Sequence, residues 1–187
     1  QPKEPIIPAA QLFPAEQPKH MTLEQAIKMA NQHQTAGRLQ QAEVLLRQIL
    51  LEHPRQPHAL HLLGIIAHQV GKIDIALEYI GKAIAADKTN VQFLVNYTEM
   101  CRLAGRLDEA INHGEQAIAL APDSHAAHSN LGVAYYDKHE FELAEKHQKR
   151  ALELKPDLAP ALNNLGSICR EHKDMEGAIK YYQKAIA

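Results

Sequence analysis

Small and apolar residues return along this chain at a fixed interval of 34 positions. The clearest series is one of alanines, which stand at Ala42, Ala76, Ala110, Ala144 and Ala178. A second series in a constant phase contains Ala83, Ala117, Ala151 and Ala185, and a third contains Gly64, Gly132 and Gly166. A fixed interval of this kind is typical of proteins that stack one structural unit on the next.

Within each interval the apolar residues recur every three or four positions, which is the period of an α-helix. In the first interval this pattern predicts a helix over 23–36, and Thr22 with Gln25 forms a capping-box pattern at its start. Glycine follows the first helix in three repeats, where a left-handed residue ends a helix at low cost. His139 and Lys173 take that place later, so we expect those turns to be less favourable. Second helices are expected to begin near Leu39, Ile73, Leu107, Phe141 and Met175.

The interval and its positions resemble the tetratricopeptide repeat, whose pattern is W-x2-L-G-x2-Y, then A-x3-F, then P. The strings NLGVAYY from Asn130 and NLGSICR from Asn164 carry the resemblance most clearly, whereas the tryptophan position holds other residues throughout. The resemblance implies an all-α fold, a right-handed superhelical solenoid of five helix-turn-helix repeats with the last one truncated. The repeats are expected over 23–56, 57–90, 91–124, 125–158 and 159–187.

Residues 1–22 differ from the repeat domain expected over 23–187. Five prolines rule out a long helix in this segment, so we expect an extended, proline-rich N-terminal arm. Two interpretations stay open: a linker, or an arm that docks on a groove through Ile6, Ile7, Leu12 or Phe13.

The fifth repeat reaches Ala187 within its second helix, and we interpret the chain as a piece of a longer array. In that interpretation Ile179, Tyr182 and Ile186 are partly uncovered. Contiguous apolar surface tends to find a partner, so we expect self-association there, through this open end or through the N-terminal arm of another copy.

The composition of the chain argues against several kinds of binding partner. The chain is 45% hydrophobic and 22% charged, with a formal net charge of −2. No clustered positive excess is visible, so we expect no nucleic-acid partner. No apolar run approaches the roughly 20 residues of a membrane span, and residues 1–22 lack a basic start followed by an apolar block. These features predict a cytoplasmic protein.

Candidate chemistry is sparse. His58 with His61, and His125 with His128, share a helix face, but neither pair has a cysteine or glutamate at ligand spacing, so we predict no metal site and no cofactor. Cys101 and Cys169 are two repeats apart, too far for a disulfide, so both are expected to be free thiols. Nucleophile elbows and phosphate loops are absent from the sequence, so we predict no catalysis by this chain.

Asparagine occupies the sixth place of three consecutive repeats, at Asn96, Asn130 and Asn164, where earlier repeats hold Lys28 and Leu62. An asparagine amide can donate and accept hydrogen bonds at once, which matches a peptide backbone. This ladder resembles the helical arm of O-linked N-acetylglucosamine transferases, where asparagines in this phase hold extended substrates. The alternative is that these amides bond locally between adjacent repeats. The other residues expected in the groove are His61, Glu99, Arg102, Tyr136 and Arg170.

The sequence therefore predicts a scaffold that holds a protein or peptide, in extended form, in a concave groove. Two further hypotheses stay open. The chain is the substrate-recruiting, non-catalytic arm of a larger glycosyltransferase or other transferase, or it is a self-assembly scaffold.

Overall fold

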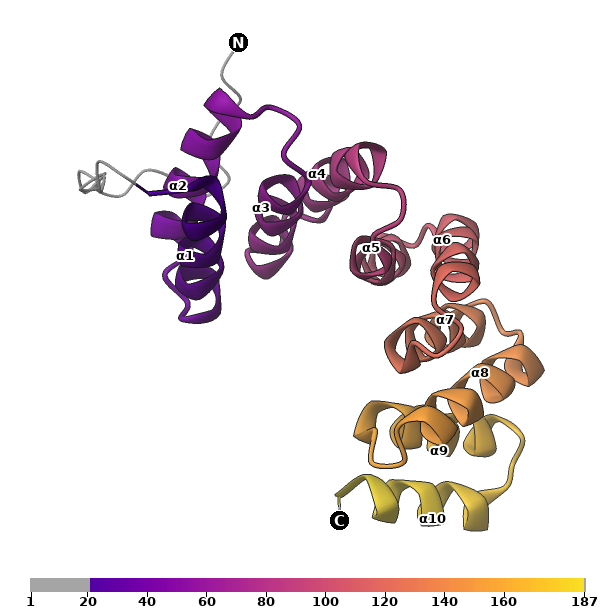
Figure 1. Ribbon diagram of the computed structural model, residues 1–187. Coiled ribbons are helices and arrows are strands. Elements are labelled where there is room, and N and C mark those ends of the chain that lie inside the picture. The colour runs from indigo at the N-terminus through magenta and orange to yellow at the C-terminus, as the bar shows by residue number, and fades with distance from the viewer. Residues whose placement is uncertain (1–20, 187) are drawn as a thin grey trace. The chain divides into compact units, whose positions relative to one another are not determined.

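The structure, a computed structural model, describes residues 21–186, and all regular secondary structure in this stretch is helical (Figure 1). The helices in this stretch are α1 Leu23–Thr35, α2 Leu39–Glu52, α3 Pro57–Gln69, α4 Ile73–Ala86, α5 Val91–Leu103, α6 Leu107–Leu120, α7 His125–Asp137, α8 Phe141–Leu154, α9 Ala159–Glu171 and α10 Met175–Ile186. The all-α fold of five helix-turn-helix repeats is confirmed. The division into an arm over 1–22 and a repeat domain over 23–187 stays a prediction, because residues 1–20, with the candidate anchors Ile6, Ile7, Leu12 and Phe13, lie outside the described residues.

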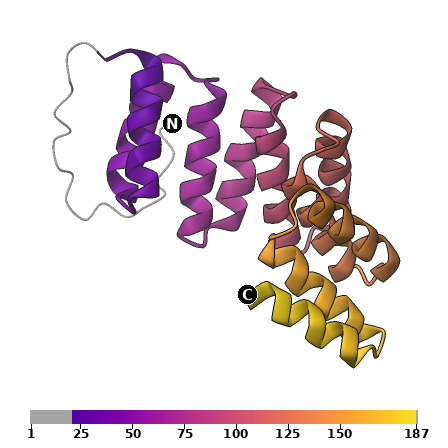
Figure 2. The same cartoon turned by 60° about the horizontal axis from the view of Figure 1, so that its bottom comes forward.

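The chain divides into two compact units, which are described separately. The first runs to Phe93 and holds α1 packed on α2, α2 on α3, and α3 on α4. The second begins at Leu94, within α5, and holds α6 packed on α7, α7 on α8, α8 on α9, and α9 on α10. Figure 2 shows the α7–α8 and α9–α10 hairpins from a second direction. In both units, therefore, the second helix of a repeat packs against the first helix of the next.

Helix starts agree with the sequence pattern. The Thr22 hydroxyl accepts a hydrogen bond from the Gln25 backbone N–H at 3.2 Å, and the Gln25 side chain accepts one from the Thr22 N–H at 2.9 Å, so the capping box is confirmed. All five second helices begin at the residues that the pattern indicates. The first helix ends at Thr35, one residue before the expected end, because the chain turns at Gly37, which has left-handed backbone at φ 73°.

Paired helices approach closely because one of them carries a small residue at the contact. A Cβ atom added to Gly64 of α3 would overlap the Ile80 side chain on α4, and one added to Gly132 of α7 would lie 2.7 Å from Gln148 Nε2 on α8. Gln148 is fully buried, and its amide nitrogen donates to the Ser129 carbonyl at 2.9 Å. A buried amide with its donor satisfied in this way is tolerated in a helical core.

The third repeat reverses this arrangement of sizes. Its first helix carries the larger Thr98, which is buried, and its second helix carries Gly114. A Cβ on Gly114 would lie 3.4 Å from Thr98 Cγ2 and 3.0 Å from Leu131 of α7. One small residue for each helix pair is therefore kept, although the helix that supplies it changes.

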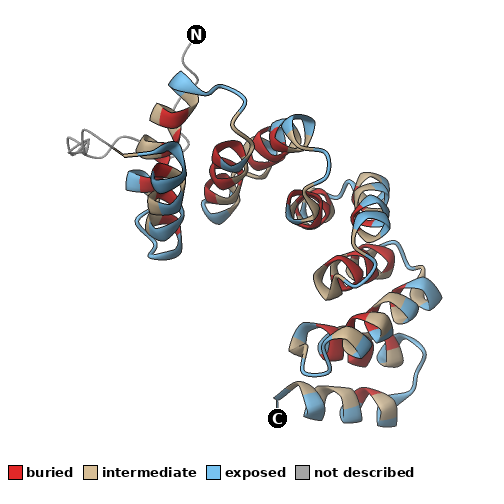
Figure 3. Ribbon diagram, viewed as in Figure 1, coloured by how far each residue is buried: buried red, intermediate tan, exposed pale blue. Residues whose placement is uncertain are grey.

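The core of the second unit lies between its successive helices (Figure 3). Its cluster of buried side chains comprises Leu131, Tyr135, Ala144, Leu165 and Ile168, with Ile111, Ile118, Phe141 and Leu152 packed against it. Each repeat thus buries its apolar face against its neighbour, as stacked repeats must.

The turns inside the repeats use left-handed backbone. Three of them place glycine there, including Gly105 at φ 73°, whereas the last two place His139 at φ 64° and Lys173 at φ 63°. A residue with a Cβ pays roughly 1–2 kcal/mol for this conformation. These are the two turns that the sequence predicts to be less favourable.

Replacing Lys173 by glycine should therefore raise the free energy of unfolding by about 0.5–1 kcal/mol, since the gain in the turn exceeds the added entropy of the unfolded chain. Chemical denaturation of the Lys173→Gly protein measures this change. The reverse substitution, Gly105→Lys, is the matched control and should destabilise, since its Cβ meets nothing within 4 Å and only the backbone conformation is at stake. A destabilised Lys173→Gly protein would contradict the assignment of strain to this turn.

Candidate functional site

Most of the predicted groove residues lie on the first helices of the second unit. Glu99 and Arg102 come from α5, Asn130 and Tyr136 from α7, and Asn164 and Arg170 from α9. We call these six residues, together with Asn96 of α5, the first-helix face. Helices α7 and α9 contact each other directly, so their side chains on this face are neighbours.

Two polar contacts join successive first helices across this face. Arg102 donates to the Asp137 carboxylate at 2.8 Å, and Tyr136 donates to the Glu171 carboxylate at 3.2 Å. Both contacts join residues 35 positions apart, so the twelfth place of one repeat bonds to the thirteenth place of the next. We call them the rungs.

Charge pairing fixes Arg102 in place. Its guanidinium makes two bonds to the Glu99 carboxylate, at 2.8 and 3.1 Å, in addition to the rung with Asp137. The hydrogen bonds that Arg102 donates to Glu99 and to Asp137 raise the pKa of Arg102 above its ordinary value. Arg102 is therefore always charged, and its hydrogen bonds fix the position of its side chain on the first-helix face.

The asparagines differ in what they bind. Asn130 donates from its amide nitrogen to the Val95 carbonyl of α5 at 3.1 Å, and no donor in residues 21–186 reaches its side-chain oxygen. Asn164 is half-buried, and its side chain has no hydrogen-bond partner within the described chain. The carbonyl equivalent to that of Val95 is that of Ser129, and Gln148 already donates to it. Local bonding between repeats therefore occurs at Asn130, whereas at the equivalent of this contact Gln148, and not Asn164, donates to the carbonyl.

His61 lies in the first unit, on α3. Its ring stacks on Phe93, with centroids 4.6 Å apart, and His58 meets the same ring edge-on at 5.5 Å. Burial, with a smaller effect of His58, lowers the pKa of His61 to about 4. The ring is thus neutral at pH 7 and packs as a partly buried aromatic group against Phe93.

Sequence reasoning missed the rungs and the Val95 carbonyl. Asp137 and Glu171 occupy the thirteenth position of their repeats, and Arg102, Tyr136 and Arg170 occupy the twelfth. Comparing these two positions between successive repeats would have indicated the pairing. The backbone acceptor left no such signal, because any residue type supplies a carbonyl.

His128, which the sequence pairs with His125, contacts His147 of α8 in the structure. His128 Nε2 lies 3.0 Å from the Pro122 carbonyl, which makes it a donor there, and His128 Nδ1 lies 3.1 Å from His147 Nδ1. Burial and the neighbouring His128 lower the pKa of His147 to about 4. In the neutral tautomer of His128 that donates from Nε2, the Nδ1 atom is unprotonated and accepts from His147.

Other chemistry is limited in the part of the chain that is described. No group of three or more histidine, cysteine or acidic side chains there is placed to hold a metal ion. Both cysteines are free thiols. Burial raises the pKa of Cys101 to about 12 and raises that of Cys169 as well, which disfavours the thiolate that reacts as a nucleophile. Between residues 21 and 186, no helix has the length and apolar character that crossing a membrane requires.

These features define a helical-repeat protein with an ordered polar face. Three tetratricopeptide-repeat profiles match its sequence, over residues 27–91, 99–139 and 123–187. The chain belongs to the tetratricopeptide repeat family. No curated protein sequence matches it.

Solved structures of similar fold include MamA, PilF from Pseudomonas aeruginosa, and PilW, which is described as a widely conserved type IV pilus biogenesis factor. Each is 22% identical to this chain. The TM-score is 0.74 for MamA, with 89% of this chain and 94% of that chain covered. It is 0.79 for PilF, with 87% and 74% covered, and 0.80 for PilW, with 86% and 74% covered. At this identity the likeness concerns the fold alone.

Proposed function

We propose that this chain is a non-catalytic scaffold that holds an extended polypeptide against the first-helix face of its second unit. The observation that carries the proposal is the unused hydrogen-bonding capacity of Asn130 and Asn164. The amide nitrogen of Asn130 donates to the Val95 carbonyl, so its side-chain oxygen is left to accept a hydrogen bond from a ligand. The side chain of Asn164 can both donate a hydrogen bond to a ligand and accept one from it. A peptide backbone offers one N–H and one C=O at each residue, so neighbouring asparagines on parallel helices suit an extended chain.

The rungs support this proposal because they fix the surroundings of the asparagines. Arg102 and Tyr136 are held by Asp137 and Glu171 before any ligand arrives. Side chains that are already ordered lose little entropy on binding, which leaves more of the contact energy for affinity. Because the charge of Arg102 is balanced by Glu99 and Asp137, the face should recognise the backbone and the shape of a peptide rather than its charge.

Asn164 provides the sharper test of recognition, because it makes no hydrogen bond within the described chain. Replacing it by alanine should leave the free energy of unfolding within about 0.5 kcal/mol of the wild type, as for other changes that remove no internal contact. Peptide affinity should fall by about 2–13-fold, which corresponds to one hydrogen bond of ~0.5–1.5 kcal/mol.

The probe is a 12-residue peptide selected from a phage-displayed library on the wild-type chain, measured by fluorescence anisotropy. Asn130→Ala serves as the comparison, since it removes the bond to Val95 and should lower both stability and affinity. If Asn164→Ala binds the peptide as the wild type does, the asparagines are structural and the proposal fails. Failure to enrich any peptide would have the same meaning.

A further inference from the structure

We propose that the first-helix face binds the N-terminal segment of this chain, residues 5–14, in the polyproline II conformation. This inference rests on the proposed function, because it names the ligand of the same site. Residues 1–20 lie outside the described residues, and it is their sequence that matches the geometry of the face.

The distance between neighbouring asparagines selects the period of the ligand. Asn130 and Asn164 occupy the same place on α7 and α9, which contact each other directly. Helices packed in this way have axes roughly 8–10 Å apart. Two residues of a β-strand span only about 6.4–6.8 Å, whereas one turn of polyproline II, with three residues at ~3.1 Å each, spans about 9.3 Å. A chain that crosses the helices obliquely needs a longer span still, so the two-residue period fits worse.

A step of three residues also decides the direction in which backbone groups point. In a β-strand successive residues face opposite sides, so residues three apart point away from each other. Polyproline II has three residues per turn, so residues three apart point the same way. Only this conformation presents equivalent N–H groups to the side-chain oxygens of Asn130 and Asn164.

The prolines of the N-terminal segment keep a period of three. Pro2, Pro5, Pro8 and Pro14 stand in one phase, and the other two phases contain no proline from residue 1 to residue 16. Proline has no backbone N–H, so a face that needs an N–H at every third residue accepts either of these two phases. Proline in the remaining phase fixes φ near its polyproline II value, which lowers the entropy lost on binding.

The segment and the surface that it contacts are both uncharged. Residues 5–15 carry no charge. On the face, Ala126 and Val133 lie about one turn on either side of the asparagine of α7, and Pro160 and Ser167 hold the same places on α9. Pro160 is exposed and the other three are half-buried, and the Ser167 hydroxyl donates to a carbonyl of its own helix at 3.2 Å. A charged side chain would lose water here without gaining a partner, whereas apolar side chains and proline rings do not.

A peptide with the sequence of residues 1–16 tests the period. Fluorescence anisotropy should detect its binding to a chain that lacks residues 1–16, with a dissociation constant below about 1 mM. Gln11→Pro in the peptide should keep or raise the affinity, because it extends the existing proline phase. Ala9→Pro and Ala10→Pro place proline in the other two phases, and at least one of them should lower the affinity by about 2–13-fold, the effect of one lost hydrogen bond. Absence of binding, weaker binding of the Gln11→Pro peptide, or equal binding of all four peptides would overturn the proposal.

Variants of the chain test the site. Asn164→Ala should weaken binding of the unmodified peptide by about 2–13-fold, whereas Asn112→Ala, the same change at an exposed place on α6, is the matched control and should change nothing. The full chain should bind the peptide at least about threefold more weakly than the shortened chain, because its own segment competes for the face. Equal affinity of the full and shortened chains, or a peptide affinity that Asn164→Ala leaves unchanged, would also overturn the proposal.

The outcome is separable from that of the proposed function. If the phage-selected peptide depends on Asn164 and the peptide of residues 1–16 does not bind, the proposed function stands and only the assignment of this ligand fails.

Discussion

Replacing Gly64 by threonine is expected to destabilise the first unit by about 1–3 kcal/mol, the usual range for overpacking a close helix contact. A Cβ at this position would overlap the Ile80 side chain of α4. It would also lie 3.2 Å from the Ala76 carbonyl oxygen, which belongs to α4 as well. Threonine is chosen because the third repeat holds Thr98 at the equivalent place. Thermal unfolding should show the change as a decrease in Tm of several degrees, given ~2–4 °C per kcal/mol for a chain of this length.

The control restores the arrangement of the third repeat. Ile80→Gly removes the side chain that would clash, as Gly114 does opposite Thr98. Alone it should be strongly destabilising, since it leaves a cavity and places glycine in a helix. The double variant Gly64→Thr with Ile80→Gly should be more stable than the sum of the two single changes predicts, by more than about 1 kcal/mol. Strictly additive effects would show that the two residues do not limit each other.

Acidification from pH 7 to pH 4 should destabilise both units through His61 and His147. Burial lowers the pKa of each from 6.5 to about 4. The unfolded chain therefore binds protons below pH 6.5 that the folded chain does not, so stability is complete above about pH 6.5 and decreases as pH falls toward 4. Allowing for screening of these partly exposed rings, we expect a loss of about 2 kcal/mol for each histidine.

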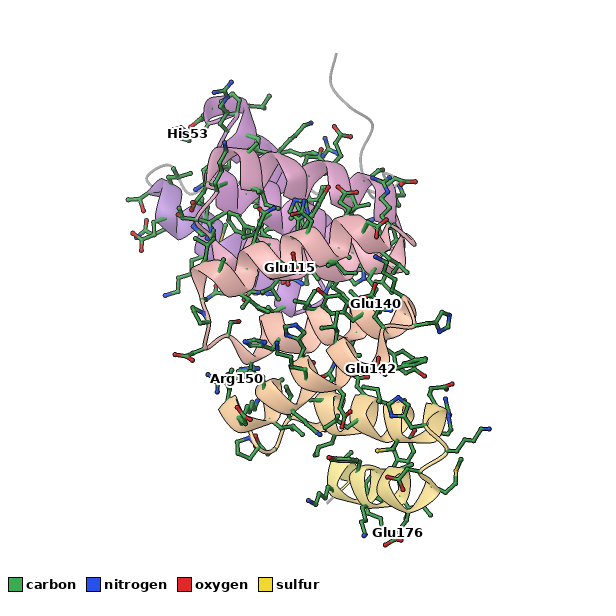
Figure 4. All side chains as sticks on the ribbon, turned by 90° about the vertical axis from the view of Figure 1, so that its right-hand side faces the viewer. His53, Glu115, Glu140, Glu142, Arg150 and Glu176 are labelled. Carbon is green, nitrogen blue, oxygen red and sulfur yellow. The ribbon has the colours of Figure 1, made fainter. Side chains whose placement is uncertain are left out.

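Glutamine variants separate the two contributions. His61→Gln should flatten the pH dependence of unfolding in the first unit, and His147→Gln should do so in the second, although each variant also loses a ring contact at neutral pH. His53→Gln, at the exposed end of α2 (Figure 4), is the control and should leave the slope unchanged. Urea denaturation at several pH values gives these slopes. Identical slopes for the wild type and His61→Gln would show that this ring is protonated equally in both states.

The helices could be predicted from sequence because their signals are local. The period, the Thr22 capping box and the starts of the second helices all depend on residues within a few positions of one another. The left-handed turns at His139 and Lys173 could be predicted for another reason, because they stand in the phase of the three glycines of the earlier repeats.

The polar contacts of the candidate site could be predicted only in part. Which partner Asn130 takes depends on how one repeat is rotated against the next, and the Val95 carbonyl carries no mark in the sequence. Asn164 shares the phase of Asn130 but not its contact, and it is Gln148 that donates to the equivalent carbonyl. A single substitution in a neighbouring helix can thus change the state of a residue that the repeat pattern treats as equivalent.

In the third repeat the larger residue, Thr98, is on the first helix and the glycine, Gly114, is on the second. In the fourth repeat the glycine, Gly132, is on the first helix and the larger Gln148 is on the second. This difference affects how such chains can evolve. Recombination between repeats that breaks the chain in the turn within a hairpin would join a first helix from one repeat to a second helix from another. Two large residues, or two small ones, would then meet at the contact. A break between hairpins keeps each matched pair together and changes only the contacts between repeats, such as the shared apolar cluster and the rung from Tyr136 to Glu171. The hairpin, rather than the single helix, is therefore the unit that can be duplicated or transplanted in this protein.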